Sequence, residues 1–267
     1  MRNGEKVVVT KRSAFNLIVI TEDESGLRTL RFGHDGVPQS VVKLGDPEHL
    51  ELPYASVLPI CLAFVQKPRR ILIVGLGGGT VPGYFHSQFP EMAVDVVEID
   101  KEVLEVAKTY CGFKEDARMH VFVEDGRDFI ENCCDRYDII VLDSFDSETI
   151  PRHLLTLEFL QAVRNALTPK GIVVANVWGR AINRSYDPML LTYREAFKEV
   201  YIFDVPVPGT KIFVALPGRQ EMTREDLLQR SREISERSGL RHDISHAIAS
   251  FRNSDFEHCR GGAVLRD

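Results

Sequence analysis

The sequence has few cysteines, few aromatic residues and no long hydrophobic run. Its 267 residues include five cysteines and one tryptophan, and 9% are aromatic. The odd cysteine count and the absence of a CxxC pair exclude a disulfide scaffold and favour reduced thiols in a cytoplasmic protein. The longest apolar stretch, residues 55–65, is interrupted by Ser56 and Pro59. It falls short of the roughly 20 apolar residues that cross a bilayer, and the charged start MRNGEKVVVTKR lacks the apolar run of an export signal.

An excess of positive charge is also missing. The chain has 33 Lys and Arg against 39 Asp and Glu, which gives a formal net charge of −6. Such a field repels nucleic acid and anionic membranes. We therefore expect no nucleic-acid partner, no membrane partner, and a neutral or cationic small-molecule substrate. The rest of the composition is that of a globular protein long enough to bury a large core.

Residues 1–47 carry short β-rich runs that are separated by turn-forming segments. The runs are VVVT, FNLIVIT, LRTLRFG and SVVKL, and the turns include TEDESG and GHDGVP. This pattern predicts a small N-terminal domain of antiparallel β-hairpins. Residues 48–69 are apolar and predict a mostly helical linker that Pro59 bends or interrupts.

Residues 70–218 alternate short apolar strands with amphipathic helical segments. The strands are ILIVG, AVDVVEI, MHVFVE, YDIIVLD and GIVVANV. This alternation predicts an α/β domain with a parallel sheet covered on both faces. Two final runs, VYIFDV and KIFVALP, have only PVPGT between them, so they must pair antiparallel. The layout resembles the Rossmann-like sheet of class I S-adenosylmethionine methyltransferases. Residues 219–267 predict a C-terminal helical extension that includes TREDLLQRSREISERS.

Candidate ligand groups follow the predicted parallel strands, because doubly wound sheets bind ligands beyond the carboxyl ends of their strands. The first strand runs into a glycine loop, and the following helix start offers free N–H groups. The second strand ends in a carboxylate placed to accept both hydroxyl groups of a ribose. Further acids follow the third and fourth strands. The groups are Gly75, Gly77, Gly78 and Gly79 in the loop, then Glu98, Asp125 before Gly126, and Asp143.

Two other interpretations of the glycine loop and the strand-end acids are helix capping and a site for a different cofactor. The acids could simply cap the helices that follow them, as Asp often does. A nicotinamide or flavin site would need GxGxxG or GxGxxA, but Thr80 takes the last position, and the acids after strands three and four have no role in that site. A sulfonium nucleoside uses the acids better. Its adenine amino group needs an acceptor such as Asp125, and a negative site favours its positive sulfur.

Two features elsewhere stay open. His242, Asp243 and His246 have a spacing that could place two imidazoles on one helical face, but no further ligand lies at a fixed spacing, so we expect solvated helix residues and no metal. Trp178 follows the fifth strand at the ligand edge. It either shapes the acceptor pocket or belongs to the core.

Five segments together resemble a known family. They are ILIVGLGGGTVPGYF, VDVVEID, VEDGRDFI, YDIIVLDSFD and LLTLEFLQAVRNALTPKGIVVANV. They are similar to the spermidine synthase family of polyamine aminopropyltransferases, and most of all to its bacterial spermidine-synthase-like members and the spermidine-synthase-like methyltransferase domains. The resemblance covers residues 13–217 and includes HDGVPQS, which is similar to the family's DGxxQ element. It implies a homodimer formed through the N-terminal region.

The resemblance also implies roles for individual residues. Gln39 and Tyr54 would reach the nucleoside and substrate pocket, and the glycine loop would hold the donor. Glu98 would bind the ribose, and Asp125 with Gly126 the adenine. The remaining two are the acids of the family's DxxD element: Asp143, which would accept a hydrogen bond or proton from the attacking amine, and Asp146.

Departures from the family pattern bear on the donor. Gly78 stands where aminopropyltransferases carry an Asp that holds the amino group of decarboxylated S-adenosylmethionine. The Tyr54-Ala55-Ser56 stretch lacks two polar anchors for a polyamine, Ser147 replaces a proline, and VPVPGTKIF lacks a tyrosine. An ammonium left without its buried partner costs about 3 to 5 kcal/mol. We therefore expect an S-adenosylmethionine-type transferase acting on a small amine-like acceptor, with methyl transfer ahead of aminopropyl transfer. A non-catalytic nucleoside-binding module is the second alternative.

Overall fold

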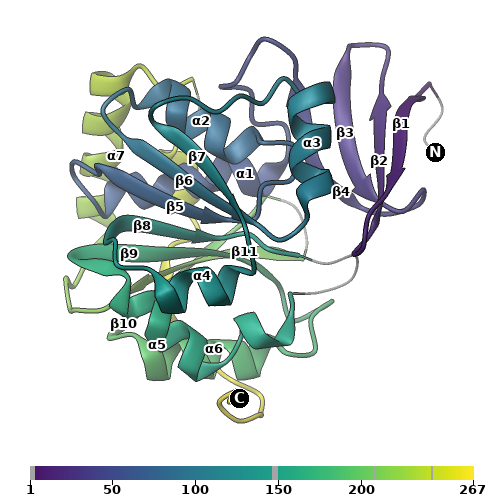
Figure 1. Ribbon diagram of the computed structural model, residues 1–267. Coiled ribbons are helices and arrows are strands. Elements are labelled where there is room, and N and C mark those ends of the chain that lie inside the picture. The colour runs from purple at the N-terminus through teal and green to yellow at the C-terminus, as the bar shows by residue number, and fades with distance from the viewer. Residues whose placement is uncertain (1–3, 146–149, 207–208, 242) are drawn as a thin grey trace.

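The computed structural model describes residues 4–145, 150–206, 209–241 and 243–267. Its N-terminal part is a four-stranded antiparallel sheet in the order β1-β2-β3-β4 (Figure 1). The strands are β1 (Lys6–Arg12), β2 (Leu17–Glu22), β3 (Leu27–Phe32) and β4 (Pro38–Lys43). The predicted hairpins are therefore confirmed, and the turn-forming segments lie between these strands.

The second sheet has eight strands in the order β12-β10-β11-β9-β8-β5-β6-β7. Its parallel strands are β5 (Arg70–Val74), β6 (Ala93–Glu98), β7 (Met119–Val123), β8 (Tyr137–Leu142) and β9 (Leu167–Trp178). An antiparallel pair follows, formed by β10 (Glu199–Asp204) and β11 (Thr210–Leu216). The expected parallel sheet with a terminal antiparallel hairpin is confirmed. The C-terminal extension adds the short strand β12 (Arg252–Asn253) beside β10, which the helical pattern of this region did not predict.

Helices cover both faces of the large sheet (Figure 1). One face carries α1 (Pro53–Val57), α2 (Thr80–Gln88), α3 (Lys101–Tyr110) and α7 (Arg224–Ser238), and the other α4 (Gly126–Asn132), α5 (Leu157–Asn165) and α6 (Tyr186–Ala196). Neighbouring residues of β5 alternate between the two cores: Ile71 and Ile73 belong to one, Leu72 and Val74 to the other. A strand buried on both faces is apolar throughout, which explains the uninterrupted ILIV run.

Residues 48–69 contribute more to the core than a linker does. Helix α1 gives way at Leu58 to a 3₁₀ helix, Leu58–Ala63, with Pro59 in its first turn. Ile60 and Cys61 of this segment are fully buried. The same hydrophobic core includes Ile18 and Ile20 from β2. The N-terminal sheet therefore packs directly against the α/β core.

The C-terminal extension contacts residues 48–69 through α7. Helix α7 begins with a capping box in which Thr223 and Asp226 exchange hydrogen bonds, as the polar start of TREDLLQ allows. Arg230 of α7 donates a hydrogen bond to the carbonyl of Ala63 over 3.3 Å. A short helix, α8 (Ser245–Ile248), leads to β12. Among the described residues, no helix has the length and apolar character needed to cross a membrane.

Candidate functional site

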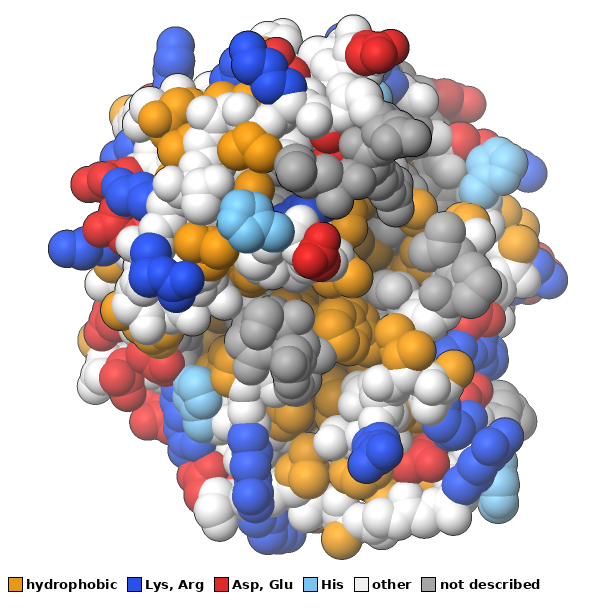
Figure 2. Space-filling model, turned by 90° about the vertical axis from the view of Figure 1, so that its right-hand side faces the viewer, with side chains coloured by type: hydrophobic (Ala, Val, Ile, Leu, Met, Phe, Trp, Pro, Cys, Tyr) orange, Lys and Arg blue, Asp and Glu red, His pale blue; other side chains and the backbone are white. Residues whose placement is uncertain are grey.

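A large cavity lies at the carboxyl ends of β5, β6, β8 and β9, between the large sheet and the N-terminal sheet. Its volume is about 850 Å³, at the upper end of the range usual for small-molecule sites. Figure 2 shows the face onto which it opens, where hydrophobic side chains gather around a central hollow. Phe15, Val37 and Ile182 line the cavity although each is more than half exposed. The cavity therefore has an apolar rim and strand ends at its floor.

The glycine loop after β5 packs closely against backbone and side-chain atoms of neighbouring segments. Gly75 has φ 109°, and a Cβ there would lie 2.4 Å from the carbonyl oxygen of Asp143. Only glycine fits that close approach. At Gly78 a Cβ would lie 2.8 Å from Cγ2 of Val42 on β4. Gly75 and Gly77 line the cavity, whereas Gly78 faces β4 and Gly79 faces Phe113.

Glu98 fixes this loop from the end of β6. Its Oε2 accepts a hydrogen bond from the backbone N–H of Leu76, and its Oε1 accepts one from that of Asp100, each over 3.0 Å. Burial raises the pKa of Glu98 against these bonds. Asp100, and not Glu98, is the N-cap of α3. The backbone N–H of Gly77 also bonds to this carboxylate. A carboxylate has about four lone-pair positions, so one remains for a hydroxyl hydrogen from the cavity that Glu98 lines.

Asp125 uses its two oxygens differently. Its Oδ1 accepts hydrogen bonds from the N–H groups of Arg127 and Asp128, so this acid does cap the helix that follows it, α4. Its Oδ2 lies 2.9 Å from Nε2 of His153. Asp125, Gly126 and His153 all line the cavity. Asp125 is thus positioned by the helix start and by an imidazole that the sequence did not bring to notice.

Asp143 lies on the cavity floor just beyond β8. Burial raises its pKa to about 7, against hydrogen bonds from the side chains of Asn176 and Tyr54 that favour the charged form. Asn176 Nδ2 donates to Asp143 Oδ1 over 2.9 Å. The single hydrogen of the Tyr54 hydroxyl is shared between Asp143 and the carbonyl of Gln39, 3.3 Å away, and burial together with the Asp143 charge raises the pKa of Tyr54. A carboxyl that titrates near neutrality is suited to proton transfer.

The structure brings most of the expected residues to one cavity. Those that line it are Gln39, Tyr54, Gly75, Gly77, Glu98, Asp125, Gly126 and Asp143. Gly78 and Gly79 support the loop from behind, and Asp146 lies outside the described residues. Trp178 also lines the cavity, where its ring stacks on Phe145 with 5.2 Å between centroids and 23° between planes. Within the described part of the chain, no group of three or more His, Cys, Asp or Glu is arranged to hold a metal ion.

Asn176 and His153 are the site residues that sequence reasoning missed. Asn176 lies near the carboxyl end of β9. The acids were selected because they follow the carboxyl ends of strands, and the same criterion applied to amide side chains would have selected Asn176. His153 gave no local signal, because it follows the fourth strand by eleven positions within a 3₁₀ turn, Arg152–Leu154.

Known proteins resemble this chain over most of its length. The family described as "Spermine/spermidine synthase domain" matches residues 54–212. A polyamine aminopropyltransferase from Vibrio vulnificus is 31% identical over 233 residues, covering 83% of this chain and 77% of that protein. An eEF1A lysine and N-terminal methyltransferase from Bos taurus is 30% identical over 184 residues, which are 64% of this chain but only 26% of that protein. This chain thus corresponds to about a quarter of the methyltransferase.

A solved structure shares the whole fold. The crystal structure of a probable spermidine synthase from Corynebacterium glutamicum superimposes with a TM-score of 0.78 at 21% identity, covering 98% of this chain and 97% of that one. At this identity the likeness concerns the fold. It includes both sheets and the C-terminal extension, because almost the full length of each chain is covered.

Proposed function

This chain belongs to the spermine/spermidine synthase family, and from that premise we propose that it transfers an alkyl group from an S-adenosylmethionine-type donor to an amine-like acceptor. The observation that carries the proposal is the Asp143 carboxyl on the cavity floor, whose pKa burial raises to about 7. Both kinds of similar protein, the polyamine aminopropyltransferase and the eEF1A methyltransferase, are transferases. A cavity of about 850 Å³ has room for donor and acceptor together.

The donor would lie along the glycine loop. Glu98 would accept hydrogen bonds from the ribose hydroxyls, and Asp125 with Gly126 would meet the adenine. The described carboxylates that line the cavity are Glu98, Asp100, Asp125 and Asp143, and the described lining residues include no lysine or arginine. This acidic lining supports a donor whose sulfur carries a positive charge.

Asp143 would prepare the acceptor. A free amine has a pKa near 10 and is mostly protonated at neutral pH, so its proton must leave before or during attack. The amine lone pair forms a bond to the carbon attached to sulfur, the carbon–sulfur bond breaks, and its electron pair stays on sulfur as a neutral thioether. The amine proton passes to Asp143, while Tyr54 and Asn176 hold the carboxylate. Collinear positioning of the three reacting atoms supplies much of the acceleration.

Within this reaction class we favour methyl transfer from intact S-adenosylmethionine. Gly78 offers no carboxylate for the amino group of a decarboxylated donor, and Val42 and Ser40 crowd the position where such a side chain would begin. The alternative is aminopropyl transfer. It is supported by the polyamine aminopropyltransferase relative, whose likeness extends over 83% of the chain.

The thioether product distinguishes these reactions. We would incubate the protein with either S-adenosylmethionine or its decarboxylated form and a panel of amines, and identify the nucleoside product by mass spectrometry. Methyl transfer releases S-adenosylhomocysteine, and aminopropyl transfer releases methylthioadenosine. Asp143→Asn should lower turnover by roughly 10²- to 10⁴-fold and retain nucleoside binding by calorimetry. Methylthioadenosine as the dominant product would refute methyl transfer. Nucleoside binding without turnover of any amine would favour a non-catalytic binding module.

A further inference from the structure

A smaller cavity adjoins the large one, and no residue of the glycine loop lines it. Its volume is about 240 Å³, and it shares Phe145, Trp178 and Ile182 with the large cavity. The stacked rings of Phe145 and Trp178 therefore form a wall common to both. The smaller cavity is also lined by Ile150, Leu155 and Met189. This aromatic wall therefore belongs both to the cavity that contains Asp143 and to the smaller one.

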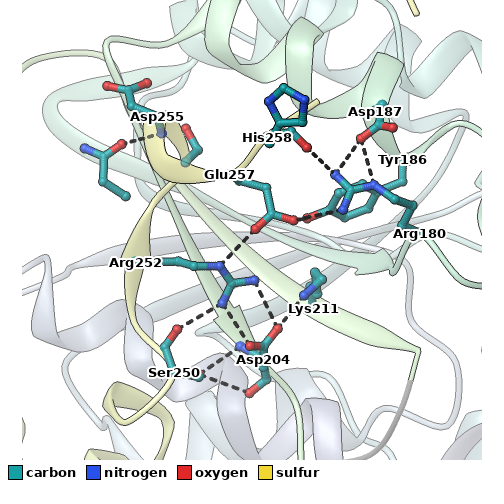
Figure 3. A network of polar contacts seen from close by, with 12 residues as sticks. Arg180, Tyr186, Asp187, Asp204, Lys211, Ser250, Arg252, Asp255, Glu257 and His258 are labelled. Carbon is teal, nitrogen blue, oxygen red and sulfur yellow. Dashed lines mark hydrogen bonds and ion pairs between the residues drawn. The ribbon is translucent and has the colours of Figure 1, made fainter. Parts of the chain in front are cut away.

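One side chain of the smaller cavity carries a positive charge. Arg184 lines it and is exposed, and it makes no hydrogen bond or ion pair with any described residue. Arg180, four residues earlier, differs in this respect. Its guanidinium lies 2.7 Å from Asp187 and 3.3 Å from Glu257, and it donates to the carbonyl of His258 over 3.0 Å (Figure 3). Arg180 thus fixes the loop after β9, while Arg184 remains available for a ligand.

A buried hydrogen-bond acceptor beside Asp143 is unpaired among the described residues. Asn176 is only 4% exposed, and its Oδ1 has no hydrogen-bond partner among the described residues. Its Nδ2 is already used by Asp143. Leaving a buried amide oxygen unpaired costs about 1 to 3 kcal/mol. An N–H donor that enters the large cavity, which Asn176 lines, would remove this cost.

We propose that the acceptor in the transfer reaction above, on which this inference rests, is an amine on a flat apolar body that ends in a carboxylate. The amine nitrogen lies between Asp143 and Oδ1 of Asn176, and the body lies along the Phe145–Trp178 wall. The carboxylate pairs with Arg184. A linear polyamine is disfavoured, because its distant ammonium would approach this arginine and like charges repel.

Calorimetry with three amines tests the proposal. The probes are 4-(2-aminoethyl)benzoate, phenethylamine, which lacks the carboxylate, and putrescine. Each is titrated into the protein alone and into the protein saturated with S-adenosylhomocysteine or methylthioadenosine. We expect the benzoate to bind at least tenfold more tightly than phenethylamine, as a charge-assisted pair allows. Because Trp178 is the single tryptophan of the sequence, its fluorescence should change as the probe binds.

Arg184→Gln should remove the tenfold preference without weakening phenethylamine. The matched control is Arg219→Gln, which changes an exposed arginine outside both linings and should keep the preference. Equal affinities for the benzoate and phenethylamine, tightest binding of putrescine, or an unchanged preference in Arg184→Gln would each overturn the proposal. Titrations without nucleoside decide these points even if neither nucleoside binds. Failure of nucleoside binding would count against the proposed function instead.

Discussion

Nδ2 of Asn176 donates a hydrogen bond to Oδ1 of Asp143 over 2.9 Å and thereby joins β9 to the end of β8 at the cavity floor. An amide does not titrate in this range, so Asn176 remains a donor that favours the charged form of Asp143 at every pH of interest. The hydroxyl of Tyr54, a residue of α1, also forms a hydrogen bond that favours the charged form of Asp143. Burial acts against both and prevails, because the pKa of Asp143 is raised to about 7.

Removing one of these donors should move the pH dependence of catalysis. Tyr54→Phe takes away a hydroxyl that favours the charged carboxylate, so the pKa of Asp143 should rise further. The acidic limb of the kcat/KM profile should then shift upward by about one pH unit, since a hydrogen bond to a charged group contributes about 1.5 kcal/mol or more. Tyr110→Phe, in a half-buried tyrosine outside the cavity lining, is the control. An acidic limb that stays in place would show that Asp143 does not set it.

The raised pKa of Asp143 also predicts a pH-dependent gain in stability for Asp143→Asn. Its folded-state pKa of about 7 lies above the ordinary value of 3.8. The neutral acid is therefore well tolerated below pH 4, and the stability of the folded state falls as pH rises through 7. Asn stays uncharged, so the variant should be more stable than the parent at pH 8, by about 2 to 4 kcal/mol. Its advantage should shrink toward pH 4.

Urea unfolding at pH 5 and pH 8 measures this difference. The midpoint of the variant should exceed that of the parent mainly at pH 8. A stability difference that is the same at both pH values would mean that burial of the charge is not its cause. A variant less stable at pH 8 would mean that the Asn176 and Tyr54 bonds outweigh the burial.

Gly78 and Gly83 provide a matched pair for the crowding of the glycine loop. A Cβ at Gly78 would lie 2.8 Å from Cγ2 of Val42 and 3.1 Å from Cβ of Ser40, whereas the nearest atom to one at Gly83 is 3.8 Å away. Gly78→Ala should therefore destabilise the fold by about 1 to 3 kcal/mol. Gly83→Ala, inside α2, should stabilise it by up to about 1 kcal/mol.

The Val42→Ala background makes this prediction specific. There the cost of Gly78→Ala should fall, because the clashing methyl group is gone, as a double-mutant cycle by urea unfolding would show. Gly78→Asp should likewise be tolerated better with Val42→Ala, and affinity for decarboxylated S-adenosylmethionine should rise in that double variant. Costs that simply add would place the origin of the glycine requirement elsewhere.

Ligands of doubly wound sheets bind beyond the carboxyl ends of the strands, and this rule explains why much of the site could be predicted from sequence. Parallel strands deliver their carboxyl ends to one edge, so Glu98, Asp125 and Asp143 meet wherever β6, β7 and β8 end. Hydrophobic alternation likewise predicted the hairpins and the order of strands and helices. These signals are local, because each depends on a run of neighbouring residues.

What could not be predicted depends on contacts between distant segments. The crowding at Gly78 comes from Val42 on β4, and the core shared by Ile18 and Ile71 joins the two sheets. Strand β12 depends on pairing of Arg252 with Ile202, fifty positions earlier in the chain. Neither periodicity nor spacing reports such pairings, which is why residues 48–69 looked like a linker and residues 219–267 like helices alone.

Glu257 connects the C-terminal extension to the acceptor side of the cavity, and this connection can be tested. Its Oε1 lies 3.3 Å from Arg180 and 3.4 Å from the Tyr186 hydroxyl, and its Oε2 lies 3.1 Å from Arg252 (Figure 3). Arg180 stands two positions after Trp178, so the contact restrains the loop that carries one cavity wall. Glu257→Gln removes the charge and keeps the shape. It should cost about 1 to 3 kcal/mol of stability.

The effect on binding should fall on one substrate only. Residues 179–185 should exchange amide hydrogens faster, and KM for the acceptor should rise several-fold. Donor affinity should stay unchanged, because Glu98 and the glycine loop take no part in the Glu257 contacts. Glu233→Gln, at an exposed position of α7, is the control, because among the described residues the Glu233 carboxylate has one hydrogen-bond partner, Gln229. Equal weakening of donor and acceptor would indicate general loosening of the fold. Unchanged acceptor KM would show that Arg180 holds this loop without Glu257, through its 2.7 Å contact with Asp187 and its hydrogen bond to the carbonyl of His258.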